Sequence, residues 1–239
     1  MNSLSNRTQY HNRHDHVVHQ IGQQIVEGRI EPGDVLPNVD ALMATFNVSR
    51  TVIREALKTL TAKGMLESRP KIGTRVRPSD EWSPLDPDIF LWKYQSGVNR
   101  QFISELIEVR RAIEPMAAKL AAERATDVEI EKMTAAYDEL ERAAAEPSEI
   151  YIDVDIAFHE TILIASHNDL LRQIAGAIRV GLRASREITI RTSSVKSLPY
   201  HFAVLEAIQN RDQEAAYGAM AYLIDQTALD IWNILEEAG

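Results

Sequence analysis

The sequence predicts a mainly α protein in two parts, an N-terminal winged helix-turn-helix and a C-terminal all-α antiparallel helical bundle. Three observations lead to this prediction. Residues 36–76 are patterned as two short helices joined by a tight turn and followed by a hairpin. Beyond residue 78, apolar residues recur at helical spacing and no strand pattern competes. Charge is divided too: residues 1–78 carry 11 Lys+Arg and 7 Asp+Glu (net +4), and residues 79–239 carry 15 and 28 (net −13).

Length and composition fit this division. The chain has 239 residues, 45% of them hydrophobic, which is enough for two domains with apolar cores. A Pro-rich polar stretch at 78–84 marks the boundary. We expect the winged helix-turn-helix over 1–77, a linker and connecting helix over 78–98, and an effector-binding and dimerisation bundle over 99–239. Four histidines near the start read as a mobile arm leading into the first helix rather than a metal site: His11, His14, His16 and His19.

Composition also excludes several classes of protein. The chain has no Cys, so it contains neither disulfides nor a thiolate metal site. No apolar run approaches the roughly 18 residues that a membrane-spanning helix needs, and no secretory signal opens the sequence. We therefore expect a cytoplasmic protein without a membrane partner.

The second short helix has the features of a recognition helix. Ser49 is a good N-cap, because its hydroxyl can accept from a free backbone N–H of the first turn. Arg50, Arg54 and Lys58 follow at intervals of four and form an outward stripe, with Thr51 beside them. Arg can form bidentate hydrogen bonds with guanine in the major groove of DNA. The alternative is a basic face that only solvent contacts.

The hairpin that follows has the composition of a DNA-contacting wing. Gly73 supplies backbone freedom for its turn. We expect Lys71, Gly73 and Arg75 to lie at the DNA, where such contacts are mainly with phosphates and carry little sequence information. Only the first part of the chain has the positive charge needed to approach DNA.

These motifs resemble the GntR family of bacterial transcription regulators. The matching segments are 25–34, 36–37, 48–57, 64–66 and 73–74. The resemblance implies binding to double-stranded operator DNA, and a two-fold homodimer on a palindrome is the expected geometry. One position departs from the family: Asp40 stands where the family often has an Arg that reaches DNA, which suggests an atypical operator.

The second part is patterned as a series of helices. We expect them at about 86–95, 99–124, 127–145, 148–166, 168–191, 197–210 and 212–237. Breaks are expected at Gly97, Thr126, Pro147, His167–Asn168, Ser193–Ser194 and Asn210. Helical bundles place ligand and metal sites in the core, on polar side chains that interrupt apolar faces.

Four polar residues interrupt the apolar faces of these helices: Arg110, Asp155, His159 and His201. The two His and the Asp suit a divalent ion such as Zn²⁺, Mn²⁺ or Ni²⁺, although each His could equally be a hydrogen-bonded core residue. Arg110 must face either an anion or a buried acid such as Glu114 or Asp155, because an unpaired buried charge is costly. All four are therefore candidate effector-binding residues.

Residues 102–235 resemble the C-terminal ligand-binding domain of the FadR subgroup of this family. The matching segments are 108–115, 121–126, 155–160, 165–168, 201–208, 211–212 and Met220. The subgroup commonly binds a metal through one Asp and three His. Asp155, His159 and His201 match the first three ligands, whereas Leu223 stands at the position of the last His. Segments 82–88, 109–115 and 121–126, with Leu223, resemble sugar-acid-responsive members and imply a galactonate-like effector.

These features favour a non-enzymatic transcription regulator, a repressor that a small carboxylate releases from its operator. The carboxylate is expected to be a sugar acid, with another organic acid as the alternative. A metal-dependent hydrolase is a further alternative, since three ligands with open positions can activate water. An architectural DNA-binding protein needs no ligand and would not require polar residues in the bundle core.

Overall fold

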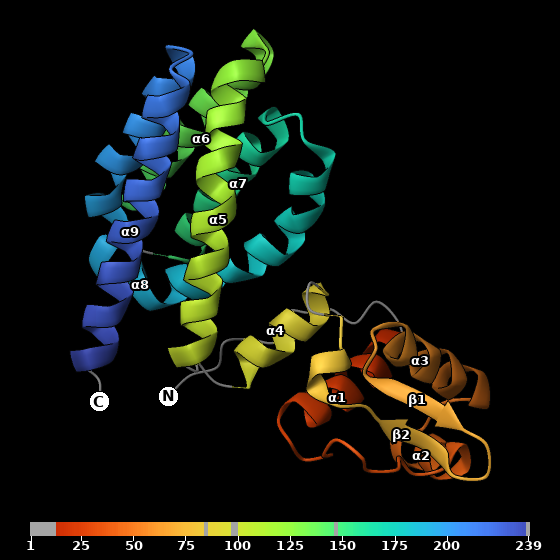
Figure 1. The fold of residues 1–239 in the computed structure, drawn as a ribbon. Helices are drawn as coiled ribbons and strands as arrows, with labels where there is room; N and C mark the ends of the chain where they lie inside the picture. The colour runs from red at the N-terminus through yellow and green to blue at the C-terminus, as the bar shows by residue number, and fades with distance from the viewer. Residues whose placement is uncertain (1–12, 84–85, 97–99, 146–147, 238–239) are drawn as a thin grey trace. The chain divides into compact units, whose positions relative to one another are not determined.

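A computed structural model describes residues 13–83, 86–96, 100–145 and 148–237 (Figure 1). The chain forms two compact units, Met1–Gly97 and Val98–Gly239. The first is a small helical domain with a two-stranded hairpin, and the second is entirely helical where it is described. The predicted fold class is therefore confirmed.

The first unit is built on three helices: α1 (Arg13–Val26), α2 (Val39–Phe46) and α3 (Arg50–Ala62). Its core gathers apolar side chains from each of them, including Ile21, Leu42 and Ile53. His14, His16 and His19 lie within α1, so the predicted mobile arm can extend only over the preceding residues, which are outside the described part of the chain.

The turn between α2 and α3 follows from its sequence. Asn47 ends α2 with φ 49° and ψ 52°, a left-handed conformation that Asn tolerates better than most residues. Ser49 then begins α3 as its N-cap, and its side chain accepts from the Val52 N–H. This short connection sets the direction of α3 relative to α2.

The wing consists of β1 (Leu66–Arg69) and β2 (Gly73–Val76), which pair antiparallel with Leu66 opposite Val76 and Arg69 opposite Gly73. Lys71 and Gly73 both have positive φ, 66° and 114°. Gly73 is well suited to its place, because side-chain-bearing residues rarely adopt such a φ. Val35 adds an isolated bridge to Arg75.

A short 3₁₀ turn, η1 (Ser79–Glu81), leads to α4 (Pro87–Gln95), and α4 packs against α1. The ring of Trp92 lies directly over Gly22, where an added Cβ would come within 2.3 Å of it. Trp92 Nε1 also donates to His19 Nδ1 over 2.8 Å. The connecting helix expected from the sequence is therefore docked within the first unit.

The second unit contains α5 (Arg100–Arg124), α6 (Asp127–Ala144), α7 (Glu149–Ala165), α8 (Asp169–Gln209) and α9 (Gln213–Glu237). Helix α9 packs against α5 and α8, and α7 packs against α5, α6 and α8. Thr126 begins α6 with a capping box that it shares with Glu129. None of the helices in the described ranges is both long and apolar enough to cross a membrane.

One predicted break is wrong. Instead of two helices separated at Ser193–Ser194, the chain forms the single helix α8, whose ribbon bends strongly in Figure 1. Serine lowers helix stability only slightly, so two serines cannot end a helix that tertiary contacts support on both sides. Pro199 lies inside α8 and removes one backbone N–H donor, which bends a helix more readily than it ends one.

Candidate functional site

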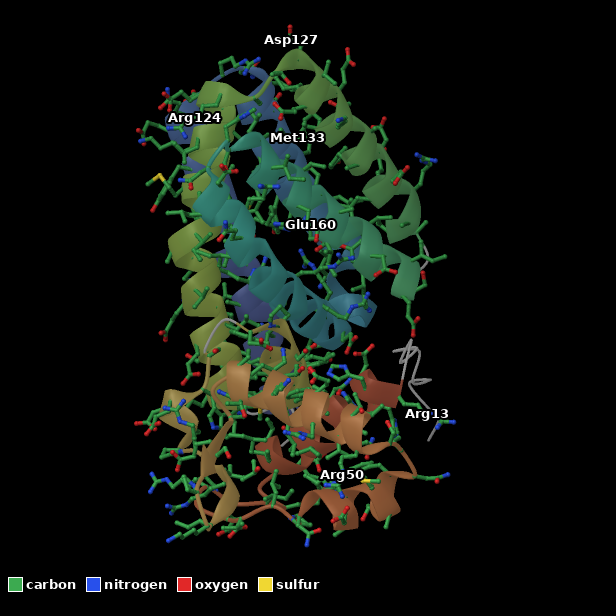
Figure 2. The ribbon with its side chains drawn as sticks, turned by 90° about the vertical axis from the view of Figure 1, so that its right-hand side faces the viewer. Arg13, Arg50, Arg124, Asp127, Met133 and Glu160 are labelled. Carbon is green, nitrogen blue, oxygen red and sulfur yellow. The ribbon has the colours of Figure 1, made fainter. Side chains whose placement is uncertain are left out.

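The predicted DNA-binding residues of α3 lie on its exposed side. Arg50, Thr51, Arg54 and Lys58 are all exposed, whereas Ile53, Ala56 and Leu60 are buried in the core of the first unit. Arg50, labelled in Figure 2, begins the helix. The helix therefore presents its basic stripe to solvent, as the sequence predicts.

Two of these cations already have acidic neighbours. Arg50 pairs with Asp40 of α2, and Lys58 Nζ lies 2.8 Å from Glu55 Oε1. Both pairs are exposed and contribute little to stability. Asp40, the residue that departs from the pattern of the resembled family, is thus in contact with the first residue of α3.

The wing residues differ in how free they are to reach DNA. Lys71 is exposed at the turn and has no ion pair among the described residues. Arg75 is half-buried, and its Nε donates to the Gly33 carbonyl over 2.9 Å. Part of the Arg75 guanidinium is thus engaged within its own unit, so Lys71 is the more accessible of the two side chains.

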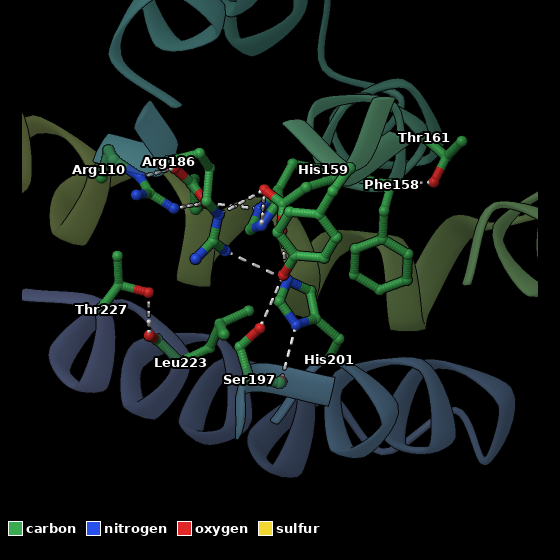
Figure 3. Close-up of polar contacts among 12 residues, drawn as sticks. Arg110, Phe158, His159, Thr161, Arg186, Ser197, His201, Leu223 and Thr227 are labelled. Carbon is green, nitrogen blue, oxygen red and sulfur yellow. Dashed lines mark hydrogen bonds and ion pairs between the residues drawn. The ribbon is translucent and has the colours of Figure 1, made fainter. Parts of the chain in front are cut away.

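The second candidate site is a buried polar cluster in the bundle (Figure 3). Three helices, α5, α7 and α8, supply its charged and imidazole groups, and all of these side chains are buried. The contributing residues are Arg110 and Glu114 of α5, Asp155 and His159 of α7, and Arg186 and His201 of α8. The four residues chosen from the sequence are thus brought together in one place.

Each of the two histidines has a polar neighbour at its outer nitrogen. His159 Nδ1 lies 2.8 Å from Glu114 Oε2, and His201 Nδ1 lies 2.8 Å from the Ser197 carbonyl oxygen. Burial lowers the pKa of His201, so its imidazole is neutral, and its one proton belongs on the nitrogen that faces the carbonyl. His201 Nε2 therefore carries a lone pair.

The same nitrogen also lies close to a carboxylate. His201 Nε2 is 3.1 Å from Asp155 Oδ1, and His159 Nε2 is 3.9 Å from Asp155 Oδ2. Two acceptors 3.1 Å apart require a shared cation or donor between them. Asp155 Oδ1 and His159 Nε2 are also buried without a hydrogen-bond partner in the described part of the chain.

Asp155, His159 and His201 thus fit a metal ion. Their potential ligand atoms lie within 4.8 Å of one another. His201 Nδ1 donates to the Ser197 carbonyl oxygen, and the Glu114 carboxylate lies beside His159 Nδ1 as an ion-pair contact without hydrogen-bond geometry. Metal-bound histidines commonly have such partners at the outer nitrogen. Leu223, fully buried on α9, offers no ligand atom in its side chain.

Arg110 combines an ion pair with a free donor. Its Nε lies 2.6 Å from Glu114 Oε1 and its Nη2 lies 3.4 Å from Glu114 Oε2. Its Nη1 is buried with no hydrogen-bond partner among the residues described. Of the two alternatives that the sequence left open, the ion pair with Glu114 is therefore present, and Nη1 could still donate to an anion.

Two members of the cluster were not chosen as site residues from the sequence, Arg186 and Glu114. Arg186 Nε donates to Asp155 Oδ2 over 2.7 Å, and its Nη2 is 3.4 Å from His201 Nε2. A signal for Arg186 existed, since Ile178, Leu182 and Ile190 surround it at intervals of four in the sequence. It interrupts an apolar spacing in the same way as Arg110.

The charges of the cluster stabilise one another. Burial alone would raise the pKa of Glu114, but Arg110 and His159 bring it down to about 2. Burial likewise opposes ionisation of Asp155, yet Arg186 and His201 hold the pKa of this carboxyl well below its usual range. Asp155 in turn raises the pKa of Arg186 against the effect of burial. Both acids are therefore ionised at neutral pH.

A basic recognition helix and wing, joined to a helical unit, define the class of helix-turn-helix transcription regulators. Comparison with known proteins gives the family: residues 13–76 match the bacterial regulatory proteins of the gntR family, and residues 105–226 match the FCD domain. The chain belongs to the GntR family and carries the FadR-like C-terminal domain. It is a transcription regulator rather than an enzyme.

Similar proteins cover nearly the whole chain. The galactonate operon transcriptional repressor of Escherichia coli (strain K12) is 34% identical over 216 residues, 89% of this chain and 94% of that protein. The regulator YieP of the same organism is 36% identical, over 86% of this chain and 89% of its own. The solved structure of Lar, which controls the agr system of Listeria monocytogenes, shares the fold with a TM-score of 0.65 at 18% identity, over 97% of this chain and 99% of Lar.

Proposed function

We propose that the protein is a homodimeric repressor that leaves its operator when a small hydroxylated carboxylate binds in the core of the second unit. The observation that supports this most directly is that Nη1 of Arg110 is buried and has no hydrogen-bond partner among the described residues, so it could donate to a bound anion. Guanidinium N–H groups bind carboxylates strongly. The name of the similar galactonate operon repressor makes a galactonate-like sugar acid the first ligand to test, ahead of other organic acids.

In this proposal a divalent ion assists the carboxylate. Asp155, His159 and His201 would hold Zn²⁺, Mn²⁺ or Ni²⁺, and the ion would supply positive charge and open positions for ligand oxygens. The residues of the chain would orient the ligand: Arg110 offers a donor, and the hydroxyl groups of a sugar acid can use the other polar atoms of the cluster.

The proposed DNA contacts lie in the first unit. Arg50, Thr51, Arg54 and Lys58 would read base edges from α3, while Lys71, Gly73 and Arg75 would contact phosphates from the wing. Arg54 is the sharpest test, because it is exposed on α3 without a salt bridge among the described residues, whereas Arg50 and Lys58 have acidic neighbours.

The experiment has two arms with the full chain. Operators are first selected from random DNA duplexes, and Arg54→Ala is expected to weaken operator binding by roughly 1–3 kcal/mol and to relax specificity at one base pair. Galactonate and other sugar acids are then added to the wild-type complex. Release is expected only for ligands that bind the DNA-free state more tightly.

Each arm can fail separately. An Arg54→Ala variant with unchanged affinity and specificity would contradict the recognition-helix assignment. A wild-type complex indifferent to every sugar acid, but released by another organic acid, would replace the effector class and leave the repressor intact. Tighter operator binding on adding a ligand would contradict the proposed direction of regulation.

A further inference from the structure

Arg186 lies at the centre of the buried cluster, in contact with two of the three potential metal ligands. The side chain is 1% exposed, its Nε is 2.7 Å from Asp155 Oδ2, and its Nη2 is 3.4 Å from His201 Nε2. Figure 3 shows it between Arg110 and the two histidines. Asp155 and His201 thus already have a cation beside them.

A guanidinium cannot share these atoms freely with a metal ion. It is permanently charged, carries only N–H donors and has no lone pair for coordination. The lone pair of His201 Nε2, which a metal would use, faces an N–H group of Arg186. A divalent ion held by Asp155 and His201 would therefore meet both Coulomb repulsion and competition for these atoms.

The charge balance of the cluster also disfavours binding of a free divalent ion. Arg110 and Arg186 are matched by Glu114 and Asp155, so the four buried charges are neutral together. A divalent ion would add two positive charges in a place where Leu223 provides no further ligand. Such an excess is costly to bury unless an anion accompanies it.

We propose that Arg186 competes with the metal ion for Asp155 and His201. The guanidinium holds both residues while no ion is bound, and it thereby keeps the affinity of the site for a free divalent ion low. Metal binding then requires Arg186 to release both residues, and an arriving carboxylate favours this release because it offers the guanidinium a new partner. The inference rests on the proposed function of this cluster as a ligand site and adds how that site is regulated.

The test measures Ni²⁺ alone, by calorimetry or competition with a coloured chelator, on the full chain without DNA or effector. Arg186→Gln is expected to bind Ni²⁺ at least about tenfold more tightly than wild type, because a unit charge next to the ion is removed. Arg183→Gln is the matched control: Arg183 is in the same helix, partly exposed and paired with Asp153, and its loss should leave the affinity unchanged. Adding His159→Ala to Arg186→Gln should abolish the gain, which separates this site from the histidines near the N-terminus.

The result that would overturn the proposal is equal or weaker Ni²⁺ binding by Arg186→Gln, or an equal gain in Arg183→Gln. Arg186→Lys keeps the charge and should stay near wild type, so a gain as large as that of the Gln variant would also overturn it. If Arg186→Gln is unfolded without metal, circular dichroism should show it refolding at Ni²⁺ concentrations that leave wild type metal-free; failure to refold would count against competition. A sugar-acid thermal shift of the wild type, measured separately, tests the proposed ligand site independently.

Discussion

Arg110 shows how a single buried charge can serve both stability and ligand binding. It interrupts the apolar face of α5 and pairs with Glu114 one turn later, where both side chains are almost fully buried. The pair explains why the bundle tolerates a charge at this position. Its Nη1 has no hydrogen-bond partner in the described part of the chain, so the same residue remains a candidate for effector binding.

Removing Arg110 should therefore destabilise the bundle strongly. We expect Arg110→Ala to lower the free energy of unfolding by about 3–5 kcal/mol, because Glu114 is left buried without its guanidinium partner. Arg111→Ala is the control: Arg111 pairs with Asp225 at the surface, and its loss should cost about 0–1 kcal/mol. Urea denaturation measures both, and similar costs for the two variants would contradict the buried-pair interpretation.

His19 should make the stability of the first unit depend on pH. Burial lowers its pKa, against the opposing effect of Asp88, and its Nδ1 must be unprotonated to accept from Trp92. The unfolded chain takes up a proton near the ordinary value of 6.5, while the folded chain resists until a lower pH. Stability is thus fully present above pH 6.5 and falls as the pH drops toward the lowered pKa.

A His19→Gln variant tests this directly, since an amide oxygen can replace the acceptor but does not titrate. Trp82 and Trp92 lie in the first unit and Trp232 in the second, so tryptophan fluorescence follows the unfolding of the first unit when Trp232 is replaced by Phe in both proteins. Between pH 8 and pH 5 the wild type should lose more stability than the variant. Parallel pH profiles would show that another group is responsible.

At the scale of elements, the docking of α4 on α1 depends on a glycine. Gly22 lies under the ring of Trp92, where an added Cβ would approach its atoms to 2.3 Å. Alanine usually stabilises a helix interior relative to glycine by about 1 kcal/mol. In this case the clash with a fully buried ring should outweigh that gain.

We expect Gly22→Ala to destabilise the first unit by about 1–3 kcal/mol, the usual cost of overpacking. Gly218→Ala in α9 is the opposite case, because nothing lies within 4 Å of its added Cβ, and it should gain up to about 1 kcal/mol. Thermal denaturation of both variants gives the comparison. A stabilised Gly22→Ala variant would mean that α4 does not hold Trp92 against α1.

At the scale of the whole molecule, the two parts of the chain carry opposite net charges, which matches the proposed roles of DNA binding and ligand binding. The first 78 residues carry +4 and the remainder −13, so the proposed DNA contacts must come from the first unit. The salt dependence of operator binding reports how many phosphates the protein contacts. A wing that contacts phosphates should therefore contribute to this salt dependence.

Lys71→Ala should reduce the slope of log K against log salt by about 0.9 for each wing that contacts a phosphate, while sequence preference is retained. Lys119→Ala removes a cation from the second unit, where it pairs with Glu214, and should leave the slope unchanged. Titrations from 50 to 200 mM salt are suitable, roughly the range over which such contacts show. An unchanged slope for Lys71→Ala would place the phosphate contacts elsewhere.

The sequence alone determined the fold class, the positions of α3 and the wing hairpin, and four residues of the buried cluster. Each of these depends on local order: Ser49 caps α3 within one turn, Gly73 permits the wing turn, and Arg110 interrupts an apolar face of known period. The spacing of apolar residues along a helix indicates which side of the helix is buried. That was enough to select Asp155 and His159, four residues apart on α7.

Only the tertiary structure decided which partners these residues meet. Arg186 and Asp155 are 31 positions apart and lie on different helices, and Glu114 reaches His159 from α5. The continuity of α8 through Ser193–Ser194 was also decided at this level. The physical reason is that helical period fixes the direction of a side chain from its own axis, whereas packing between helices fixes what lies opposite it, and only the second decides whether a buried charge finds a partner or a ligand.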